Sequence, residues 1–399
     1  MNKKLIISTF PIHNHHCTVT ALEEEGRIVE MQIQKTEEPS ILGNIYIGKV
    51  QKIVPNIQAA FIDISPGCSC YYPMEEKQHP FFTSYKTDST LKAGDELIVQ
   101  VRTEAIKSKM PTVTSNLNIT GKYLVLTTEK TGIGLSAKLS SDEKEDLKAL
   151  ILPYLRKNCG LVVRTNARDV DKAVLLQELD YLYSQIDQIY KKGPSRSCYS
   201  LIKTANPEYI HALRNIRSQN LDAVITDTSE VYEHIQNYLY DFQPEDGPKL
   251  RMYEDDLLPL YKLYSLETIL TQACQEKVWL KSGGFLMIQQ TEAFVTIDVN
   301  TGKYQGKKKA SETYRKINLE AAKEIAIQLR LRNLSGIILI DFINMTNKEH
   351  QEELLSILHN HLKNDFVKAV VIDITPLHIV EVTRQKTRKS LIEQISITK

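Results

Sequence analysis

The chain has 399 residues, whereas a single hydrophobic core stops growing at roughly 250 to 300, so more than one domain is expected. Fifty Lys and Arg residues against 49 Asp and Glu residues leave a formal charge of +1, so bulk charge does not indicate a nucleic-acid partner. No apolar stretch approaches the roughly 18 residues of a membrane helix, and the N-terminal apolar run, which stops at Pro11, is too short for a signal peptide. We expect a soluble, cytoplasmic protein with no membrane partner.

Six cysteines are scattered along the chain, and the only close pair, Cys68 and Cys70, has a spacing that matches neither a zinc ribbon nor a redox motif. Ordinary reduced cysteines are therefore expected. Three histidines and one cysteine fall within residues 13–17, but no second ligand pair follows them, so an exposed polar turn is favoured over a metal site.

The first 35 residues predict two or three strands, the last one alternating apolar and polar residues after a glycine turn. Short β-like runs broken by Gly and Pro continue to about residue 129, and such short strands with frequent turns favour a small barrel or sandwich. Residues 140–158 predict a helix with a serine cap, 160–167 a buried strand, and 169–192 a long amphipathic helix.

Residues 207 to about 275 again alternate between helical and strand patterns, which gives the chain a mixed α/β character. The last part contains two hydrophobic strand runs, 284–299 and 336–343, with a helix at 311–333 between them. A helix of this length is suited to crossing between neighbouring strands.

Two acids follow buried residues of these last strands. Asp298 stands near the end of the first strand, Asn300 lies two residues further on the same side of an extended chain, and Asp341 ends the second strand. If the strands are neighbours, the two carboxylates converge on a point where a Mg²⁺ ion suits phosphodiester hydrolysis. Spacing alone leaves the ordinary alternative open, because such aspartates often form turns or helix caps.

Three segments, 281–302, 317–345 and 380–391, closely resemble the catalytic region of the ribonuclease E/G family. The resemblance implies that Asp298 and Asp341 are the ligands of a catalytic Mg²⁺ ion, for which Mn²⁺ substitutes. It also implies that Asn300 hydrogen-bonds and orients Asp298, so that these three residues form the catalytic site.

Residues 41–64 resemble the start of the S1 RNA-binding domain of the same family, a small barrel of the oligonucleotide-binding type. The resemblance implies that Phe61 and Tyr71 stack on RNA bases and that Lys109 lies near the bound strand. At the position of Tyr71 the family more often has Phe, and Tyr still stacks. The alternative for Phe61 is a plain core residue, because it belongs to an apolar run.

Arg164 and Thr165 match a pocket that grips the 5′ monophosphate of RNA in this family, and a guanidinium fork with a hydroxyl suits a terminal phosphate. The alternative for Arg164 is an ordinary surface ion pair. Two basic runs, 303–309 and 383–390, either follow the RNA backbone or form solvated faces, and contact with RNA is favoured for the first.

Family members commonly continue into a paired-cysteine zinc motif that links two subunits, whereas no cysteine follows Cys274 here. We therefore expect no structural zinc and, for any homo-oligomer, no zinc link. The resemblance implies an α/β multidomain fold with an S1 barrel inserted in a ribonuclease H-like part, followed by a deoxyribonuclease I-like catalytic part. The expected parts are ribonuclease H-like (1–35 and 211–278), S1 (36–119), 5′-sensing (120–210) and deoxyribonuclease I-like (279–399).

The function implied is that of a magnesium-dependent endoribonuclease. It would cut single-stranded RNA in ribosomal RNA processing or messenger RNA decay, be stimulated by a 5′ monophosphate, and leave 5′-phosphate ends. The alternative is a catalytically inactive S1-type RNA-binding protein, against which the presence of both acids and the asparagine argues. A magnesium phosphotransferase is disfavoured because the chain has no Gly-rich nucleotide-binding motif.

Overall fold

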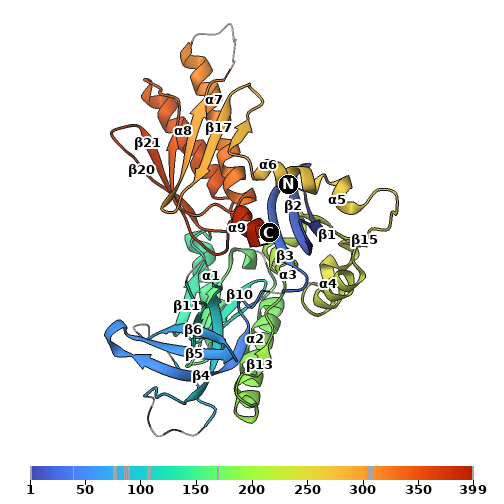
Figure 1. The fold of residues 1–399 in the computed structure, drawn as a ribbon, viewed down its shortest axis with the longest axis vertical. Helices are drawn as coiled ribbons and strands as arrows, with labels where there is room; N and C mark the ends of the chain where they lie inside the picture. The colour runs from blue at the N-terminus through green and yellow to red at the C-terminus, as the bar shows by residue number, and fades with distance from the viewer. Residues whose placement is uncertain are drawn as a thin grey trace. The chain divides into compact units, whose positions relative to one another are not determined.

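The computed structural model describes most of the chain, and within it the chain divides into two compact units. One unit comprises Met1–Glu38 with Ser218–Lys399, and the other comprises Pro39–Arg217. The second unit is therefore an insertion in the first (Figure 1). Helices and strands mix in both units, which confirms the predicted α/β class. The described residues are 2–38, 40–74, 79–84, 86, 88, 90–105, 109–168, 170–302 and 310–397.

The inserted unit contains a closed barrel of five strands. Strand β4 pairs with β5 on one side and with β7 on the other, and β6 and β8 complete the ring, so the predicted barrel is confirmed and has the closure of an oligonucleotide-binding fold. Strand β13 (Leu201–Lys203) adds to the edge of β4. The barrel strands are β4 (Ile45–Val54), β5 (Ala59–Ser65), β6 (Cys68–Pro73), β7 (Glu96–Thr103) and β8 (Thr112–Thr114).

A second, four-stranded sheet follows the barrel in the inserted unit, in the order β11-β12-β10-β9. Helix α1 begins with the predicted serine cap, which forms a capping box: the Ser140 and Glu143 side chains each accept from the backbone N–H of the other. Helix α2 buries a stripe of apolar residues at helical spacing. These elements are β9 (Asn118–Thr120), β10 (Leu124–Thr127), β11 (Gly132–Leu135), α1 (Ser141–Ile151), β12 (Gly160–Val163), α2 (Lys172–Lys192) and α3 (Glu208–Asn215).

In the other unit, segments before and after the insertion share one sheet. The first three strands form an antiparallel meander, and β14 joins β1 in parallel, so the sheet order is β15-β14-β1-β2-β3. Its elements are β1 (Lys3–Ile12), β2 (His15–Glu24), β3 (Arg27–Lys35), β14 (Leu221–Thr226), α4 (Ser229–Phe242), β15 (Leu250–Met252), α5 (Leu260–Leu263) and α6 (Leu266–Ala273).

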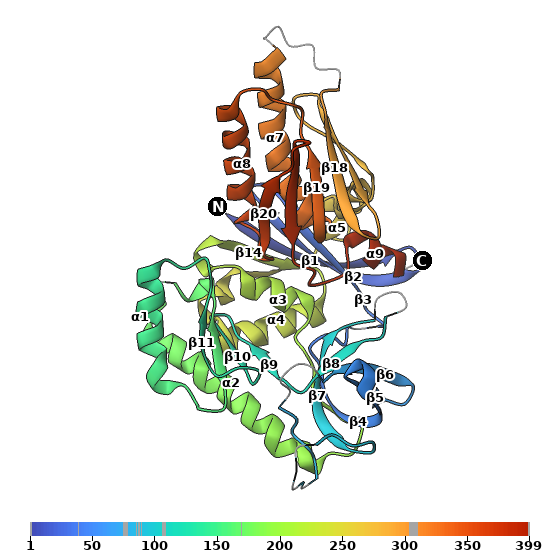
Figure 2. The same cartoon turned by 90° about the vertical axis from the view of Figure 1, so that its left-hand side faces the viewer.

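The same unit contains a six-stranded sheet in the order β16-β17-β18-β19-β21-β20. Helices α7 and α8 lie against one face of this sheet (Figure 2), and residues 317, 321, 325 and 329 of α7 are buried as the sequence pattern predicts. The elements are β16 (Lys277–Trp279), β17 (Phe285–Gln290), β18 (Phe294–Asn300), α7 (Ala310–Leu331), β19 (Gly336–Asp341), α8 (Lys348–Leu362), β20 (Ala369–Ile374), β21 (Ile379–Arg384) and α9 (Leu391–Ile397).

One strand expectation was wrong. Residues 284–299 form not one strand but the hairpin of β17 and β18. The Thr291 hydroxyl donates to the carbonyl of Phe294 and accepts from its N–H, which closes the turn. The sequence pattern did not reveal this turn, because residues 291–294 contain no Gly or Pro to mark it.

Short 3-10 helices complete the described structure, and none of its helices is long and apolar enough to span a membrane. They are η1 (Pro55–Ile57), η2 (Leu152–Tyr154), η3 (Thr165–Ala167), η4 (Gly193–Ser195), η5 (Ser218–Asn220) and η6 (Pro244–Lys249).

Candidate active site and RNA-binding surfaces

Asp298 and Asp341 lie directly opposite each other on neighbouring strands. Strands β18 and β19 are parallel, and the two aspartates are register partners. Their chain neighbours Ile297 and Ile340 are buried under α7 and α8, so both carboxylates project from the opposite face, where they are exposed. Since paired strands lie about 4.8 Å apart, the fold brings two residues 43 positions apart in sequence side by side.

Asn300 holds the first of these carboxylates. It follows two residues after Asp298 on the same strand face, and its side-chain amide donates to Asp298 Oδ2 at 2.7 Å. One carboxylate oxygen is thereby oriented by the amide, while Oδ1 and the remaining lone pairs stay available to a cation.

Glycines allow the backbone to close tightly behind Asn300. Gly302 has a φ of +61°, and a Cβ added there would lie 2.3 Å from the Gly283 carbonyl oxygen. A Cβ at Gly284 would lie 2.8 Å from the Asn300 carbonyl oxygen. The turn before β17 and the end of β18 therefore pack backbone to backbone, which anchors the strand end that carries Asn300.

The two carboxylates fit Mg²⁺, which is commonly held by one or two carboxylates while waters and substrate phosphate oxygens complete its shell. Across the described ranges, no group of three or more His, Cys, Asp or Glu side chains is placed to hold a metal. Residues 13 and 14 form the expected exposed turn of the β1–β2 hairpin, whereas residues 15–17 begin β2 and Cys17 is buried; all six cysteines carry free thiols.

The structure describes only one of the two basic runs. Residues 303–309 lie outside the described residues. In the run 383–390, Arg384 is only 4% exposed, because its guanidinium donates to Asp365 Oδ2 at 2.7 Å and to Asn333 Oδ1 at 2.8 Å. That arginine is part of the core packing, whereas residues 385–387 of the run are exposed.

On the barrel, Phe61 and Tyr71 form an aromatic pair. They are register partners on β5 and β6, and their ring centroids lie 6.3 Å apart at an interplanar angle of 78°. Both are half-buried, whereas Ala60, Ile62 and Tyr72 turn into the barrel core, so the alternative of a plain core role for Phe61 does not hold. Lys109, just before β8, is exposed.

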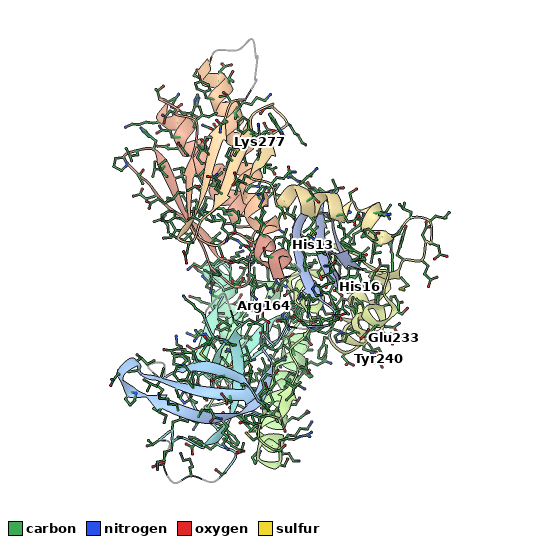
Figure 3. All side chains as sticks on the ribbon, viewed as in Figure 1. His13, His16, Arg164, Glu233, Tyr240 and Lys277 are labelled. Carbon is green, nitrogen blue, oxygen red and sulfur yellow. The ribbon has the colours of Figure 1, made fainter. Side chains whose placement is uncertain are left out.

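Arg164 (labelled in Figure 3) lies directly after β12 in a shell of acceptors. Its guanidinium donates to the carbonyl oxygens of Gly121, at 2.9 Å, and Lys122, at 3.2 Å, and also to the side-chain oxygen of Asn215. These partners come from the β9–β10 turn and from the last residue of α3, and no local sequence signal pointed to them. The contacts fix the plane of the guanidinium.

Thr165 and Glu178 lie in the same neighbourhood. The Thr165 hydroxyl shares a 2.8 Å hydrogen bond with the Ser136 hydroxyl, while the Thr165 carbonyl accepts from Arg217 at 3.0 Å. Glu178 accepts from three consecutive backbone N–H groups, at 122–124. Burial raises the pKa of Glu178, against the lowering effect of those N–H groups and of the Arg164 charge.

Comparison with known proteins decides the family. The model of the ribonuclease E/G family matches residues 118–387, which include both aspartates, Asn300 and Arg164. The chain belongs to the ribonuclease E/G family. Ribonuclease G of Escherichia coli strain K12 is 32% identical over 409 residues, covering 98% of this chain and 81% of the relative.

Two further relatives are similar to the chain at about the same identity. Ribonuclease G of Haemophilus influenzae is 33% identical over 389 residues, 94% of this chain and 78% of the relative. Ribonuclease E of Escherichia coli strain K12 is 30% identical over 383 residues, 94% of this chain but 36% of the relative. Family membership confirms the predicted enzyme class, so the chain is an endoribonuclease of the ribonuclease E/G family.

Proposed function

We propose that this member of the ribonuclease E/G family hydrolyses single-stranded RNA at the exposed face of the β16–β21 sheet, with Asp298 and Asp341 as ligands of one Mg²⁺ ion. The register pairing of these two aspartates supports the proposal, because it puts two hard carboxylate ligands side by side on an open surface that admits an RNA strand. The hydrogen bond from Asn300 to Asp298 supports it further.

In this proposal each residue has one task. The carboxylates hold the ion, and Asn300 keeps the Asp298 carboxylate turned toward it. When bound, the ion would supply Lewis-acid stabilisation of the phosphate oxygens and would lower the pKa of a ligated water. Water would add to phosphorus while the P–O3′ bond breaks and the 3′ oxygen takes up a proton, which leaves 5′-phosphate and 3′-hydroxyl ends. Mn²⁺ takes similar oxygen ligands and is proposed to substitute.

The RNA would be held by the inserted unit. We assign base stacking to Phe61 and Tyr71 and phosphate contact to Lys109, because a paired, half-exposed aromatic surface on a barrel suits single strands. Arg164 and Thr165 are proposed to bind a 5′ monophosphate that stimulates cleavage.

In this proposal the five-stranded sheet is the ribonuclease H-like part and the β16–β21 sheet the deoxyribonuclease I-like part, within the domain boundaries predicted above. Ribosomal RNA processing or messenger RNA decay in the cytoplasm is the proposed setting.

The decisive experiment measures cleavage of a 5′-phosphorylated oligonucleotide by the full chain in the presence of Mg²⁺. Asp298→Asn and Asp341→Asn should each lower kcat/KM by at least about 100-fold, since each removes charge that holds the ion. Asp373→Asn is the matched control, because Asp373 is an exposed acid on β20 of the same sheet, and it should leave cleavage unchanged. Full activity in both site variants contradicts the mechanism. RNA binding without cleavage by the unaltered chain would favour the alternative of an inactive RNA-binding protein.

A further inference from the structure

An exposed aromatic cluster lies on the edge of the β16–β21 sheet. Trp279 on β16, the only tryptophan of the chain, is 62% exposed, and its ring centroid lies 5.4 Å from that of Phe285 on β17, at an interplanar angle of 63°. The Lys277 ammonium (labelled in Figure 3) lies 4.0 Å from the Trp279 centroid and 3.9 Å from the Phe285 centroid. We call these three residues the β16–β17 cluster.

Strand register puts this cluster on the same sheet face as the two aspartates. Trp279 pairs with Phe285, and Phe285 pairs with Asn300; one step along, Lys277 pairs with Met287 and Met287 with Asp298. Register partners project to the same face of a sheet. The alternate residues on these strands, such as Leu286 and Val299, are buried against α7 and α8, which is consistent with this assignment.

The cluster is therefore close to the proposed metal ligands. Phe285 is directly across from Asn300 and diagonal to Asp298, and diagonal partners in antiparallel strands lie about 7 to 8 Å apart. Trp279 lies one strand further out. A nucleotide whose phosphate reaches the aspartates has its neighbours along the strand within reach of these rings.

The residues of the cluster are better suited to binding a nucleotide than to stabilising the fold. A tryptophan more than half exposed contributes little apolar burial, whereas its exposed ring surface is accessible to a planar partner. Aromatic rings stack on every nucleobase, and an adjacent ammonium neutralises a backbone phosphate. The positive charge of Lys277 complements a backbone phosphate of RNA.

We propose that the β16–β17 cluster is a base-stacking subsite for a nucleotide next to the scissile phosphate, with Trp279 and Phe285 stacking on the base and Lys277 meeting the backbone. This inference rests on the proposed function, since the occupant is the RNA substrate itself. It adds a second aromatic RNA contact to the Phe61 and Tyr71 pair of the barrel, which belongs to the other compact unit.

The single tryptophan allows a direct test. With excitation at the long-wavelength edge of tryptophan absorption, where the 19 tyrosines do not absorb, the emission of the full chain reports on Trp279 alone, and EDTA keeps an RNA substrate uncut. A labelled single-stranded oligonucleotide should quench this emission when its anisotropy shows saturation, whereas abasic sites at the nucleotides that flank the cleavage site should abolish the quenching. Unchanged emission at saturation, or equal quenching by the abasic strand, overturns the proposal. Emission that changes with protein concentration in the absence of RNA also overturns it, since a second copy would then occupy the rings.

Kinetics provide a second measurement. Trp279→Leu should raise KM by about 5-fold or more while kcat is largely retained, since stacking contributes to RNA binding. Lys277→Gln should lower the slope of log affinity against log salt by about 0.7, as expected for one lost phosphate contact to a single strand. Tyr240→Leu is the control, because Tyr240 is an 80% exposed aromatic on α4 outside this sheet, and it should change neither quantity. An unchanged KM in Trp279→Leu overturns the proposal.

The failures of the two proposals are distinguishable. If cleavage depends on Asp298 and Asp341 but no quenching occurs, the stacking subsite alone is wrong. If base-dependent quenching occurs but both aspartate variants cleave normally, the subsite stands and the metal mechanism is wrong.

Discussion

Single side chains of this protein act through the partners that fix them in place. Asn300 illustrates this, because its amide is useful to the site only through the 2.7 Å bond that orients Asp298. Arg164 has its guanidinium oriented by two backbone carbonyls and a side-chain amide oxygen. In both cases the side chain has the functional group that its proposed task requires, and the neighbouring residues determine how that group is oriented.

Asn300→Ala is expected to lower kcat/KM by about 10- to 100-fold and to raise the Mg²⁺ concentration needed for half-maximal rate. Loss of a group that orients a metal ligand has an effect of that order. The measurement is a cleavage rate as a function of Mg²⁺ concentration. Thr296→Ala, on the same face of β18, provides the control and should behave like the unaltered chain. Equal Mg²⁺ dependence in Asn300→Ala would show that the hydrogen bond has no role in metal binding.

Arg164→Gln is expected to reduce the preference for a 5′-phosphorylated over a 5′-hydroxyl substrate by about 10-fold or more, because a charge-assisted hydrogen bond to phosphate is lost. Cleavage of the 5′-hydroxyl substrate should change little. The two substrates are compared by kcat/KM, and Arg156→Gln, at an exposed arginine of the same unit that pairs with Asp187, is the control. A preference unaffected by Arg164→Gln would remove this residue from 5′-end recognition.

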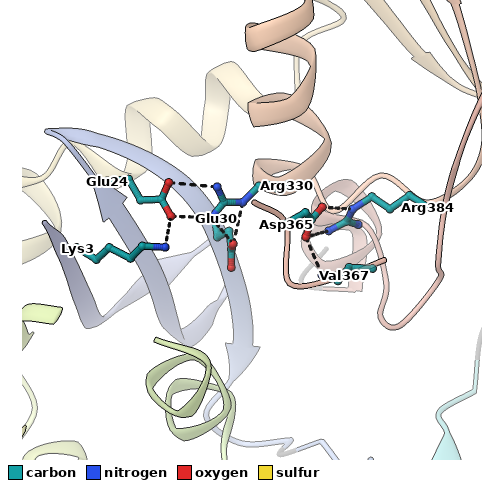
Figure 4. Close-up of polar contacts among 7 residues, drawn as sticks. All are labelled: Lys3, Glu24, Glu30, Arg330, Asp365, Val367 and Arg384. Carbon is teal, nitrogen blue, oxygen red and sulfur yellow. Dashed lines mark hydrogen bonds and ion pairs between the residues drawn. The ribbon is translucent and has the colours of Figure 1, made fainter. Parts of the chain in front are cut away.

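At the scale of elements, α7 joins the two sheets of its unit through buried charges. Near the end of α7, Arg330 donates to Glu24 of β2 and Glu30 of β3, and Lys3 of β1 also donates to Glu24 (Figure 4). Burial alone would raise the pKa of Glu24, but the hydrogen bonds and charges of Arg330 and Lys3 outweigh it and bring the pKa to about 2. The shift makes this network a source of pH-dependent stability.

The stabilisation from Glu24 should be fully present above its unfolded pKa of roughly 4.3 and should be lost as the pH falls through its folded pKa of about 2. By linkage the shift corresponds to roughly 3 kcal/mol. Glu24→Gln should therefore lower the urea midpoint of unfolding at pH 7, and the difference from the unaltered chain should shrink between pH 4.5 and 2. Glu230→Gln, at an exposed glutamate on α4, is the control. A difference that is constant with pH would rule out this role for Glu24.

At the scale of the whole molecule, one sheet is built from strands that precede and strands that follow the inserted unit in the sequence. Strand β1 pairs in parallel with β14, which lies beyond the insertion, so this sheet combines three strands from before the insertion (β1, β2 and β3) with two from after it (β14 and β15). The catalytic candidates all follow the insertion, whereas the barrel aromatics and Arg164 lie inside it. The proposed cleavage and RNA-holding tasks are therefore divided between two compact units.

Local patterns in the sequence were sufficient to predict many helices and strands. The apolar spacing of α7, the serine cap of α1 and the alternation in β3 each depend on residues a few positions apart, so the sequence alone predicts them. The resemblance of long segments was also sufficient to identify the family and its enzyme class. The turn between β17 and β18 was missed, because Thr291 closes it without a Gly or Pro signal.

Only the tertiary structure decided which distant residues meet. The register that pairs Asp298 with Asp341, the acceptors around Arg164, the burial of Arg384 and the shared face of Trp279 with Asn300 all depend on strands and helices that pack from remote parts of the chain. The free energy of such pairing comes from burial across the whole core, which no local window of sequence contains.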